Sequence, residues 1–196
     1  MAPYTHSRSP QEIEFVPLED EDHTADLWED PSQGGALGRI LEASETGDVS
    51  VMATALPTLS VSVDSTGADG DTALHIAALY GHTQCVEMLL GAGANVAVRD
   101  ADGGTPLHDA CAGGFEAIVG KLLAAVGPTG ASEAANARDG DDETPLHMAA
   151  RGGYPGIVRM LLAAGAKADA KSAAGLFPWN YAEDGSELHA LLPRCE

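Results

Sequence analysis

The chain has 196 residues, of which 44% are hydrophobic, and this is enough for one folded domain with a hydrophobic core. It carries 30 acidic residues against 10 Lys and Arg residues, and the formal charge of -20 disfavours nucleic acids and anionic membranes as partners and favours a basic protein. Its three cysteines lack the spacing of metal ligands or of a disulfide framework, and no stretch approaches the roughly 20 apolar residues of a membrane span.

The first segment, residues 1–34, holds nine acidic residues and a single Arg without helical or strand periodicity, which predicts an acidic tail with no regular structure. Apolar side chains lie among these acids, from Ile13 to Leu18 and again at Leu27 and Trp28. Three interpretations stay open: the segment folds on a partner, packs on its own domain, or remains solvated. Because it lacks a secretory signal or a transit peptide, we expect a location in the cytoplasm, the nucleus or both.

From residue 35 onward, apolar residues recur at helical spacing, and one phrase returns three times. Thr-Ala-Leu-His begins at Thr72, and Thr-Pro-Leu-His begins at Thr105 and at Thr144. Self-similarity at a period of 33 and then 39 residues is typical of a solenoid, in which each unit buries its apolar face against its neighbours. The predicted repeats are 35–68, 69–101, 102–140, 141–173 and a truncated capping repeat, 174–196.

The third repeat is six residues longer than the others, and the extra length falls between Ala125 and Glu133. Gly and Pro residues within this stretch predict an extended loop between the outer helix and the next turn. Such insertions sometimes bind a partner, and the other interpretation is an insertion that the fold tolerates and that has no binding role.

These residues resemble the ankyrin repeat family, with three well-formed copies and four to five in all. The resemblance implies an all-α repeat solenoid of stacked helix-turn-helix units with β-turn fingers. In such units the Thr would cap the first helix, Pro would occupy its first turn, and the Leu of each phrase would enter the shared core.

The histidines of the phrase, His75, His108 and His147, invite a metal hypothesis that the resemblance argues against. One histidine per repeat lies too far from the next to share an ion, because Zn–N bonds measure about 2.0 Å. The family resemblance implies that they are hydrogen-bonding links between neighbouring turns. With no nucleophile, phosphate-loop or zinc-protease motif in the chain, we expect no catalysis, cofactor or metal.

The resemblance places partners on the concave side, formed by the fingertips and the exposed positions of the first helices. Acidic residues gather at these fingertips, and an exposed Leu-Tyr pair lies beside them. The candidate protein-binding residues are Asp71, Leu79, Tyr80, Asp102, Asp109, Asp141, Asp142, Glu143 and Arg151. Two considerations oppose this interpretation: Asp and Gly are ordinary turn formers, and Arg99, Arg138 and Lys171 could pair with the acids and weaken their field.

The leading functional hypothesis is a non-catalytic module, a monomer or one subunit of a hetero-complex, that binds a basic protein or peptide through the acidic fingertips and the concave face. Small acidic ankyrin proteins that escort ribosomal proteins are similar in size and charge, so a chaperone for such a basic client is a sharper version. The alternatives are an adaptor or regulatory subunit of a larger complex, and a transcriptional cofactor that uses its acidic-hydrophobic tail.

Overall fold

The computed structural model describes residues 35–68, 70–182 and 186–192, so the expected acidic tail, 1–34, lies outside the described residues. The helices are α1 (Gly35–Thr46), α2 (Val49–Ala55), η2 (Leu56–Thr58), α3 (Ala73–Tyr80), α4 (Thr83–Gly91), α5 (Pro106–Gly113), α6 (Glu116–Ala125), α7 (Gly127–Ala135), α8 (Pro145–Gly152), α9 (Pro155–Ala163), η3 (Pro178–Tyr181) and α10 (Glu187–Leu191). None of these helices has the length and apolar character that a membrane crossing requires.

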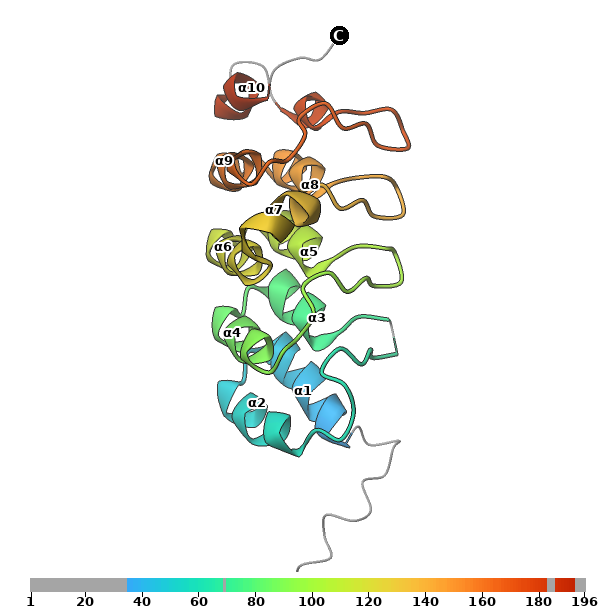
Figure 1. Ribbon diagram of the computed structural model, residues 1–196, viewed down its shortest axis with the longest axis vertical. Coiled ribbons are helices and arrows are strands. Elements are labelled where there is room, and N and C mark those ends of the chain that lie inside the picture. The colour runs from blue at the N-terminus through green and yellow to red at the C-terminus, as the bar shows by residue number, and fades with distance from the viewer. Residues whose placement is uncertain (1–34, 69, 183–185, 193–196) are drawn as a thin grey trace, which may run out of the picture.

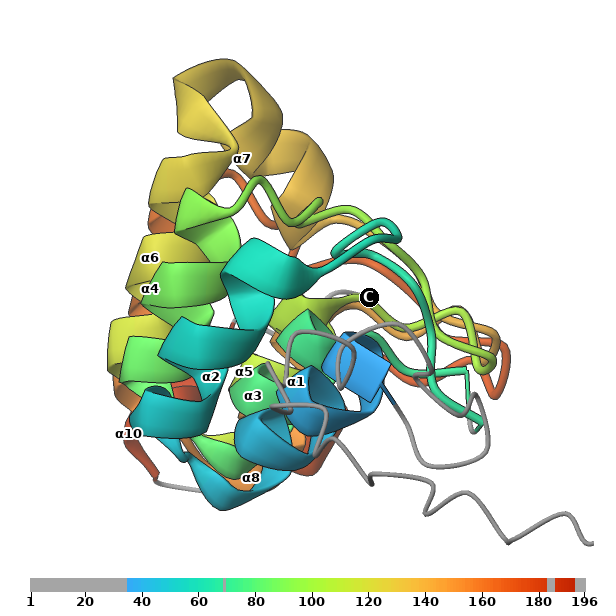
Figure 2. The same cartoon turned by 90° about the horizontal axis from the view of Figure 1, so that it is seen from below.

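The helices form antiparallel pairs that stack along one axis (Figure 1). The inner column contains α1, α3, α5 and α8, and the outer column contains α2, α4, α6 and α9. Between successive pairs the chain leaves the stack as a long finger, and Figure 2 shows these fingers projecting to one side of the helices. The expected all-α repeat solenoid with projecting fingers is therefore confirmed.

The repeated phrase starts each inner helix of the three well-formed repeats. Thr72, Thr105 and Thr144 are the N-cap residues, and each donates its backbone N–H to Nδ1 of the histidine three positions on, at 3.3, 3.1 and 3.0 Å. At the other end, Gly81, Gly114 and Gly153 adopt the left-handed conformation that terminates a helix and that glycine enters without a Cβ penalty.

Small and aliphatic side chains fill the interior between the helix pairs. Leu74, Leu107 and Leu146 are at most 1% exposed, which confirms their predicted place in the core. Cys85 and Cys111 are buried free thiols, and burial raises the pKa of both above the ordinary value. They behave as small apolar core residues.

The first repeat has the helix pair expected from its periodicity. Asp48 caps α2, because its Oδ1 accepts hydrogen bonds from the N–H groups of Ser50 and Val51 at 2.9 and 3.0 Å. Met52 and Ala55 of α2 are fully buried. This terminal unit therefore covers the core of the stack without the Thr-Pro-Leu-His phrase.

The insertion in the third repeat is a helix, so the prediction of an extended loop was wrong. Pro128 lies in the first turn of α7, where a missing N–H breaks no helical hydrogen bond, and the Ala-rich remainder of the segment favours helix. Asn136 fixes its end: Nδ2 donates to the carbonyl of Gly165 at 2.8 Å, and Oδ1 accepts from the N–H of Lys167 at 2.8 Å. Figure 2 shows α7 on the side of the stack away from the inner helices and the fingertips.

Candidate protein-binding surface

An acidic cleft of about 620 Å³ opens where two neighbouring fingers meet the inner helices α5 and α8. The second finger comprises residues 99–104 and the third finger residues 138–143. Of the residues that line the acidic cleft, six are acidic and one is an arginine: Asp100, Ala101, Asp102, Gly104, His108, Asp109, Ala112, Asp139, Gly140, Asp141, Glu143, Met148 and Arg151. The acidic cleft is therefore a negatively charged hollow on the face that the sequence indicated for a partner.

Turn chemistry explains the first acid of each finger. Asp100 Oδ1 accepts a hydrogen bond from the N–H of Gly104 at 2.7 Å. Asp139 Oδ1 accepts from the N–H groups of Asp141 and Glu143 at 3.0 and 2.8 Å. Both carboxylates hold the shape of their own finger and also line the acidic cleft. The sequence interpretation had set them aside as ordinary turn formers, so their second role was missed.

The basic residues before the fingers leave most of the acids unpaired. Arg99 Nη1 donates to the carbonyls of Gly103 and Arg138, which joins the second finger to the third. Arg138 Nη1 binds the carbonyl of Lys171 at 2.8 Å in the same way, and Lys171 Nζ lies 4.9 Å from the centre of the Phe177 ring. Apart from a 3.6 Å ion pair between Arg138 and Asp142, these cations bind backbone oxygens and a ring, so they do not pair with the carboxylates that line the cleft.

The fingertip acids divide into free and paired side chains. Asp102 and Asp141 are exposed, and neither carboxylate has a hydrogen bond or ion pair to another described residue. Asp142 is also exposed, forms a 3.6 Å ion pair with Arg138 and does not line the cleft. Its φ of 56° is left-handed, the conformation that Gly103 provides at the equivalent position of the second finger. Asp102 and Asp141 are thus the acids most available to a partner.

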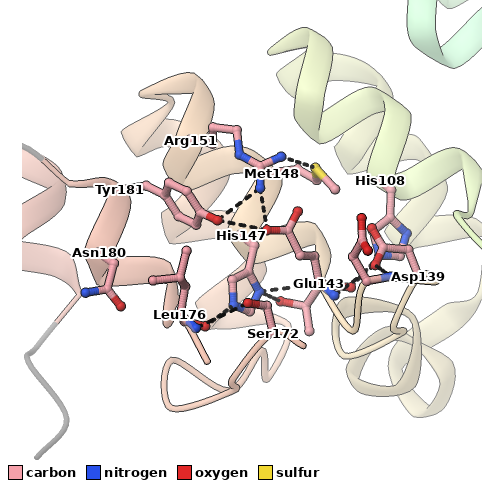
Figure 3. Close-up of polar contacts among 12 residues, drawn as sticks. His108, Asp139, Glu143, His147, Met148, Arg151, Ser172, Leu176, Asn180 and Tyr181 are labelled. Carbon is pink, nitrogen blue, oxygen red and sulfur yellow. Dashed lines mark hydrogen bonds and ion pairs between the residues drawn. The ribbon is translucent and has the colours of Figure 1, made fainter. Parts of the chain in front are cut away.

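The sequence suggested that Glu143 is an exposed fingertip acid, but its side chain is buried and paired (Figure 3). It is 7% exposed, and its Oε1 accepts hydrogen bonds from Arg151 Nη2 and from the Tyr181 hydroxyl, the latter at 2.9 Å. The Arg151 guanidinium lies 4.8 Å from the centre of the Tyr181 ring, and its bonds to Tyr181 and Glu143 raise the arginine pKa. Glu143 and Arg151 therefore neutralise each other at the edge of the cleft and join the fourth repeat to the capping repeat.

Asp109 lies on α5 at the floor of the cleft. Burial raises the pKa of its carboxyl to about 8, with smaller contributions from the neighbouring charges of Asp100 and Asp71. Its Oδ2 is buried and has no hydrogen-bond partner among the described atoms. At neutral pH this carboxyl is therefore mostly protonated, and a cation that reached it would favour the ionised form.

Two of the three repeated histidines link neighbouring repeats as the resemblance implied. Since Nδ1 accepts a backbone N–H, the neutral ring carries its proton on Nε2. His108 Nε2 donates to the carbonyl of Glu143 at 3.3 Å, and His147 Nε2 donates to the carbonyl of Leu176 at 3.2 Å. Burial lowers the pKa of both rings, which keeps them neutral. The corresponding Nε2 of His75 faces the carbonyl of Gly104, which occupies the position of Glu143, but makes no hydrogen bond of ordinary geometry.

The remaining candidates lie outside the acidic cleft. Leu79 and Tyr80, at the end of α3, are 46% and 50% exposed, so their predicted exposure is confirmed. Asp71 borders a separate hollow of about 260 Å³ near Glu42 and Glu45 of α1. Asp102, Asp109, Asp141, Glu143 and Arg151 thus all line the acidic cleft, whereas Asp71, Leu79, Tyr80 and Asp142 do not.

Comparison with known proteins gives matches across the folded region. A family model described as ankyrin repeats (3 copies) matches residues 40–131 and 89–172. Protein phosphatase 1 regulatory subunit 27 from Mus musculus is 36% identical over 84 residues, which are 43% of this chain and 54% of that protein. Protein phosphatase 1 regulatory subunit 12A from Mus musculus is 49% identical over 47 residues, which are 24% of this chain and 5% of that protein.

Rabankyrin-5 from Mus musculus is 44% identical over 55 residues, 28% of this chain and 5% of that protein. The chain spans about half the length of regulatory subunit 27 and a small part of the longer relatives.

Proposed function

Because the chain belongs to the ankyrin repeat family, we propose that it is an adaptor or regulatory subunit that binds a basic segment of a partner protein in the acidic cleft. Ankyrin repeats are protein-protein interaction modules, and the family together with its regulatory-subunit relatives favours a non-catalytic role. The proposal adds the chemical character of the partner and the surface that receives it.

One observation carries the proposal: the acids of the cleft exceed its cations and remain accessible. Asp102 and Asp141 face solvent without a partner, while Arg151, the cation of the cleft, already pairs with Glu143. Like charges held close together repel one another, and a Lys or Arg side chain of a partner would relieve this repulsion. The same field would raise the association rate of a basic segment.

The relatives supply a candidate for the class of partner. Two of them are named as regulatory subunits of protein phosphatase 1, and that name describes those proteins. A phosphatase catalytic subunit is therefore the first partner to test for this chain. An escort of a basic client such as a ribosomal protein, and a transcriptional cofactor acting through residues 1–34, are the other outcomes of the test.

The test is affinity capture with the full chain and with two double variants that change the net charge equally. Asp102→Asn with Asp141→Asn removes the two free acids of the cleft. Glu133→Gln with Asp169→Asn removes two exposed acids, one on α7 and one after α9, that do not line the cleft. The captured proteins are identified by mass spectrometry, and purified protein phosphatase 1 catalytic subunit is titrated directly.

We expect the cleft variant to lose its partner and the control variant to retain it. Capture of a phosphatase catalytic subunit would support the regulatory-subunit role, and capture of a free basic client would support the escort role instead. If the cleft variant retains every partner of the unmodified chain, the cleft is not the binding surface. If residues 1–34 alone reproduce the capture, the tail is the binding element.

A further inference from the structure

Three side chains converge where the second repeat meets the third. His75 comes from α3, Asp100 from the second finger and Asp109 from α5, and their potential ligand atoms all lie within 4.8 Å of one another. His75 is 1% exposed, and the two aspartates are partly buried. From this arrangement we infer that His75, Asp100 and Asp109 form a binding site for a divalent transition-metal ion, with Zn²⁺ as the ion that fits best.

Two buried polar atoms at this cluster have no hydrogen-bond partner within the described residues. They are Nε2 of His75 and Oδ2 of Asp109. Buried polar atoms in folded proteins are almost always hydrogen-bonded, and one left unpaired costs about 1–3 kcal/mol. His75 has only a weak contact with the carbonyl of Gly104, and the potential ligand atoms of His75 and Asp109 lie within 4.8 Å of each other, so one ion could reach both side chains.

The next junction of the same chain is an internal control for this inference. There His108, Asp139 and Met148 occupy the positions of His75, Asp100 and Asp109 (Figure 3). With methionine in the third position, His108 Nε2 donates to the carbonyl of Glu143 at 3.3 Å and is satisfied. The fold therefore does not require a weakly bonded histidine here, and within the described part of the chain the cluster occurs where the second repeat meets the third.

The distances suit a metal ion after a small adjustment of side chains. Ligands about 2.1 Å from a tetrahedral zinc lie about 3.4 Å apart, so atoms within 4.8 Å of one another need to approach by at most about 1.4 Å. Asp100 keeps its finger in place through Oδ1, which leaves Oδ2 available to an ion. The third finger lies across the acidic cleft, which provides an entry path because Asp100 and Asp109 both line it.

Binding through Nε2 requires His75 to carry its proton on Nδ1. That proton has an acceptor, because Thr72 Oγ1 lies 2.9 Å from Nδ1. The N–H of Thr72, which would lose its acceptor, makes the longest of the three equivalent contacts, at 3.3 Å compared with 3.1 and 3.0 Å. A ligating histidine whose other nitrogen donates to an oxygen is the usual arrangement in metal sites.

The donor set selects the class of ion. One imidazole and two carboxylates suit zinc better than calcium or magnesium, which prefer oxygen ligands alone. A lysine or arginine of a partner would neutralise the aspartates, but it offers only N–H donors and would leave the Nε2–H of His75 unsatisfied. The metal therefore accounts for both unpaired atoms, and the site stands whether or not the acidic cleft binds a basic segment.

The first test is calorimetric titration of the untagged, chelator-treated full chain with ZnCl₂. We expect one strong site in the unmodified chain. Asp109→Met copies the side chain of Met148 into the third repeat and should weaken that site about 100-fold or more, because even an outer partner of a ligand is worth about 10- to 100-fold. Asp169→Asn removes an exposed carboxylate that does not line the cleft and should leave the affinity unchanged.

Circular dichroism of each variant confirms that it is folded. If the unmodified chain binds no Zn²⁺, or if Asp109→Met binds it as tightly, the site does not exist. Zinc bound elsewhere, for example by His6 or His23 of the N-terminal segment, would produce the second result, because Asp109→Met would then bind it as tightly as the unmodified chain.

The second test follows the imidazole nitrogens by ¹H–¹⁵N NMR during the same titration. Zinc should move the proton of His75 from Nε2 to Nδ1, while His108 and His147 keep theirs on Nε2. A His75 that retains the Nε2–H form at saturating zinc is not a ligand, and this result would overturn the proposal.

Discussion

The junction between the second and third repeats and the junction between the third and fourth share one backbone arrangement but differ in chemistry. At the latter, the histidine donates to the next repeat, methionine follows it, and the nearby carboxylate of Glu143 is held by Arg151 and Tyr181. At the former, aspartate replaces the methionine, and both this aspartate and the histidine keep an unpaired buried atom. This one difference, Asp109 in place of Met148, separates a junction that is fully hydrogen-bonded from one that we propose as a metal site.

The largest expected effect comes from exchanging that residue. Asp109→Met should stabilise the chelator-treated protein, because burial raises the folded-state pKa of Asp109 to about 8, compared with 3.8 as the ordinary value. A shift of about four units sets a ceiling of about 6 kcal/mol, and we expect about 3–4 kcal/mol at pH 8. Urea unfolding of both proteins at several pH values measures the difference.

The sign of the pH dependence follows from the raised pKa of Asp109. Between about pH 4 and pH 8 the unfolded chain binds fewer protons than the folded one, so this carboxyl lowers the stability progressively as the pH rises. The advantage of Asp109→Met should therefore be small at pH 4, grow to pH 8 and then level off. An advantage that is the same at every pH would show that Asp109 is not a buried carboxyl.

The next effect separates the linking histidines from His75. His147→Ala should cost about 2–3 kcal/mol of unfolding free energy, because it removes a core ring, the acceptor of the Thr144 N–H and the bond to the carbonyl of Leu176. His75→Ala in chelator should cost about 1 kcal/mol less, because Nε2 of His75 makes only a weak contact with the carbonyl of Gly104 in the next repeat. Equal losses would mean that His75 links neighbouring repeats as strongly as His147.

A smaller effect compares the two fingertips. Asp142 occupies with φ 56° the position that Gly103 occupies with φ 78°. Asp142→Gly should stabilise the chain by about 0.5 kcal/mol, because glycine removes the left-handed strain but loses more backbone entropy on folding. Gly103→Ala should destabilise it by about 1 kcal/mol. Thermal melts of the two variants check the opposite signs.

The smallest expected effect is on the stability of the cleft variant. Asp102→Asn with Asp141→Asn removes exposed, unpaired carboxylates, so its unfolding free energy should stay within about 0.5 kcal/mol of the unmodified value. A larger loss of unfolding free energy, measured by urea unfolding, would show that these two acids stabilise the fingers and are not reserved for binding.

The repeat period predicted the helix pairs, the Thr caps and the buried leucines, because each of these depends on residues a few positions apart. It failed at α7, where Gly127, Pro128 and Gly130 suggested a loop although Pro and Ala also suit the start and body of a helix. Local spacing cannot decide between such uses of the same residues. The helix at this position is fixed by contacts that the sequence does not state: Ala135 is fully buried, and Asn136 binds the carbonyl of Gly165.

The sequence predicted which surface holds the acidic residues, but it did not predict which side chains pair with them. Counting from the repeated phrase placed Asp102, Asp109 and Asp141 on one surface. The contacts that set their availability join residues far apart, such as Glu143 with Tyr181 and His75 with Asp109, and they depend on the thickness and tilt of each repeat. Burial of Asp109 likewise follows from packing between repeats, which a single sequence does not state.

The most direct test of the central claim is the affinity of the captured partner between 50 and 500 mM salt, measured for the unmodified chain and for the Asp102→Asn, Asp141→Asn variant. We expect the variant to bind about 5-fold more weakly at low salt, as loss of two exposed charge pairs implies, and to depend less on salt. The Glu133→Gln, Asp169→Asn control should follow the unmodified chain. Identical affinities and salt slopes for all three proteins would contradict an acidic cleft that binds a basic segment.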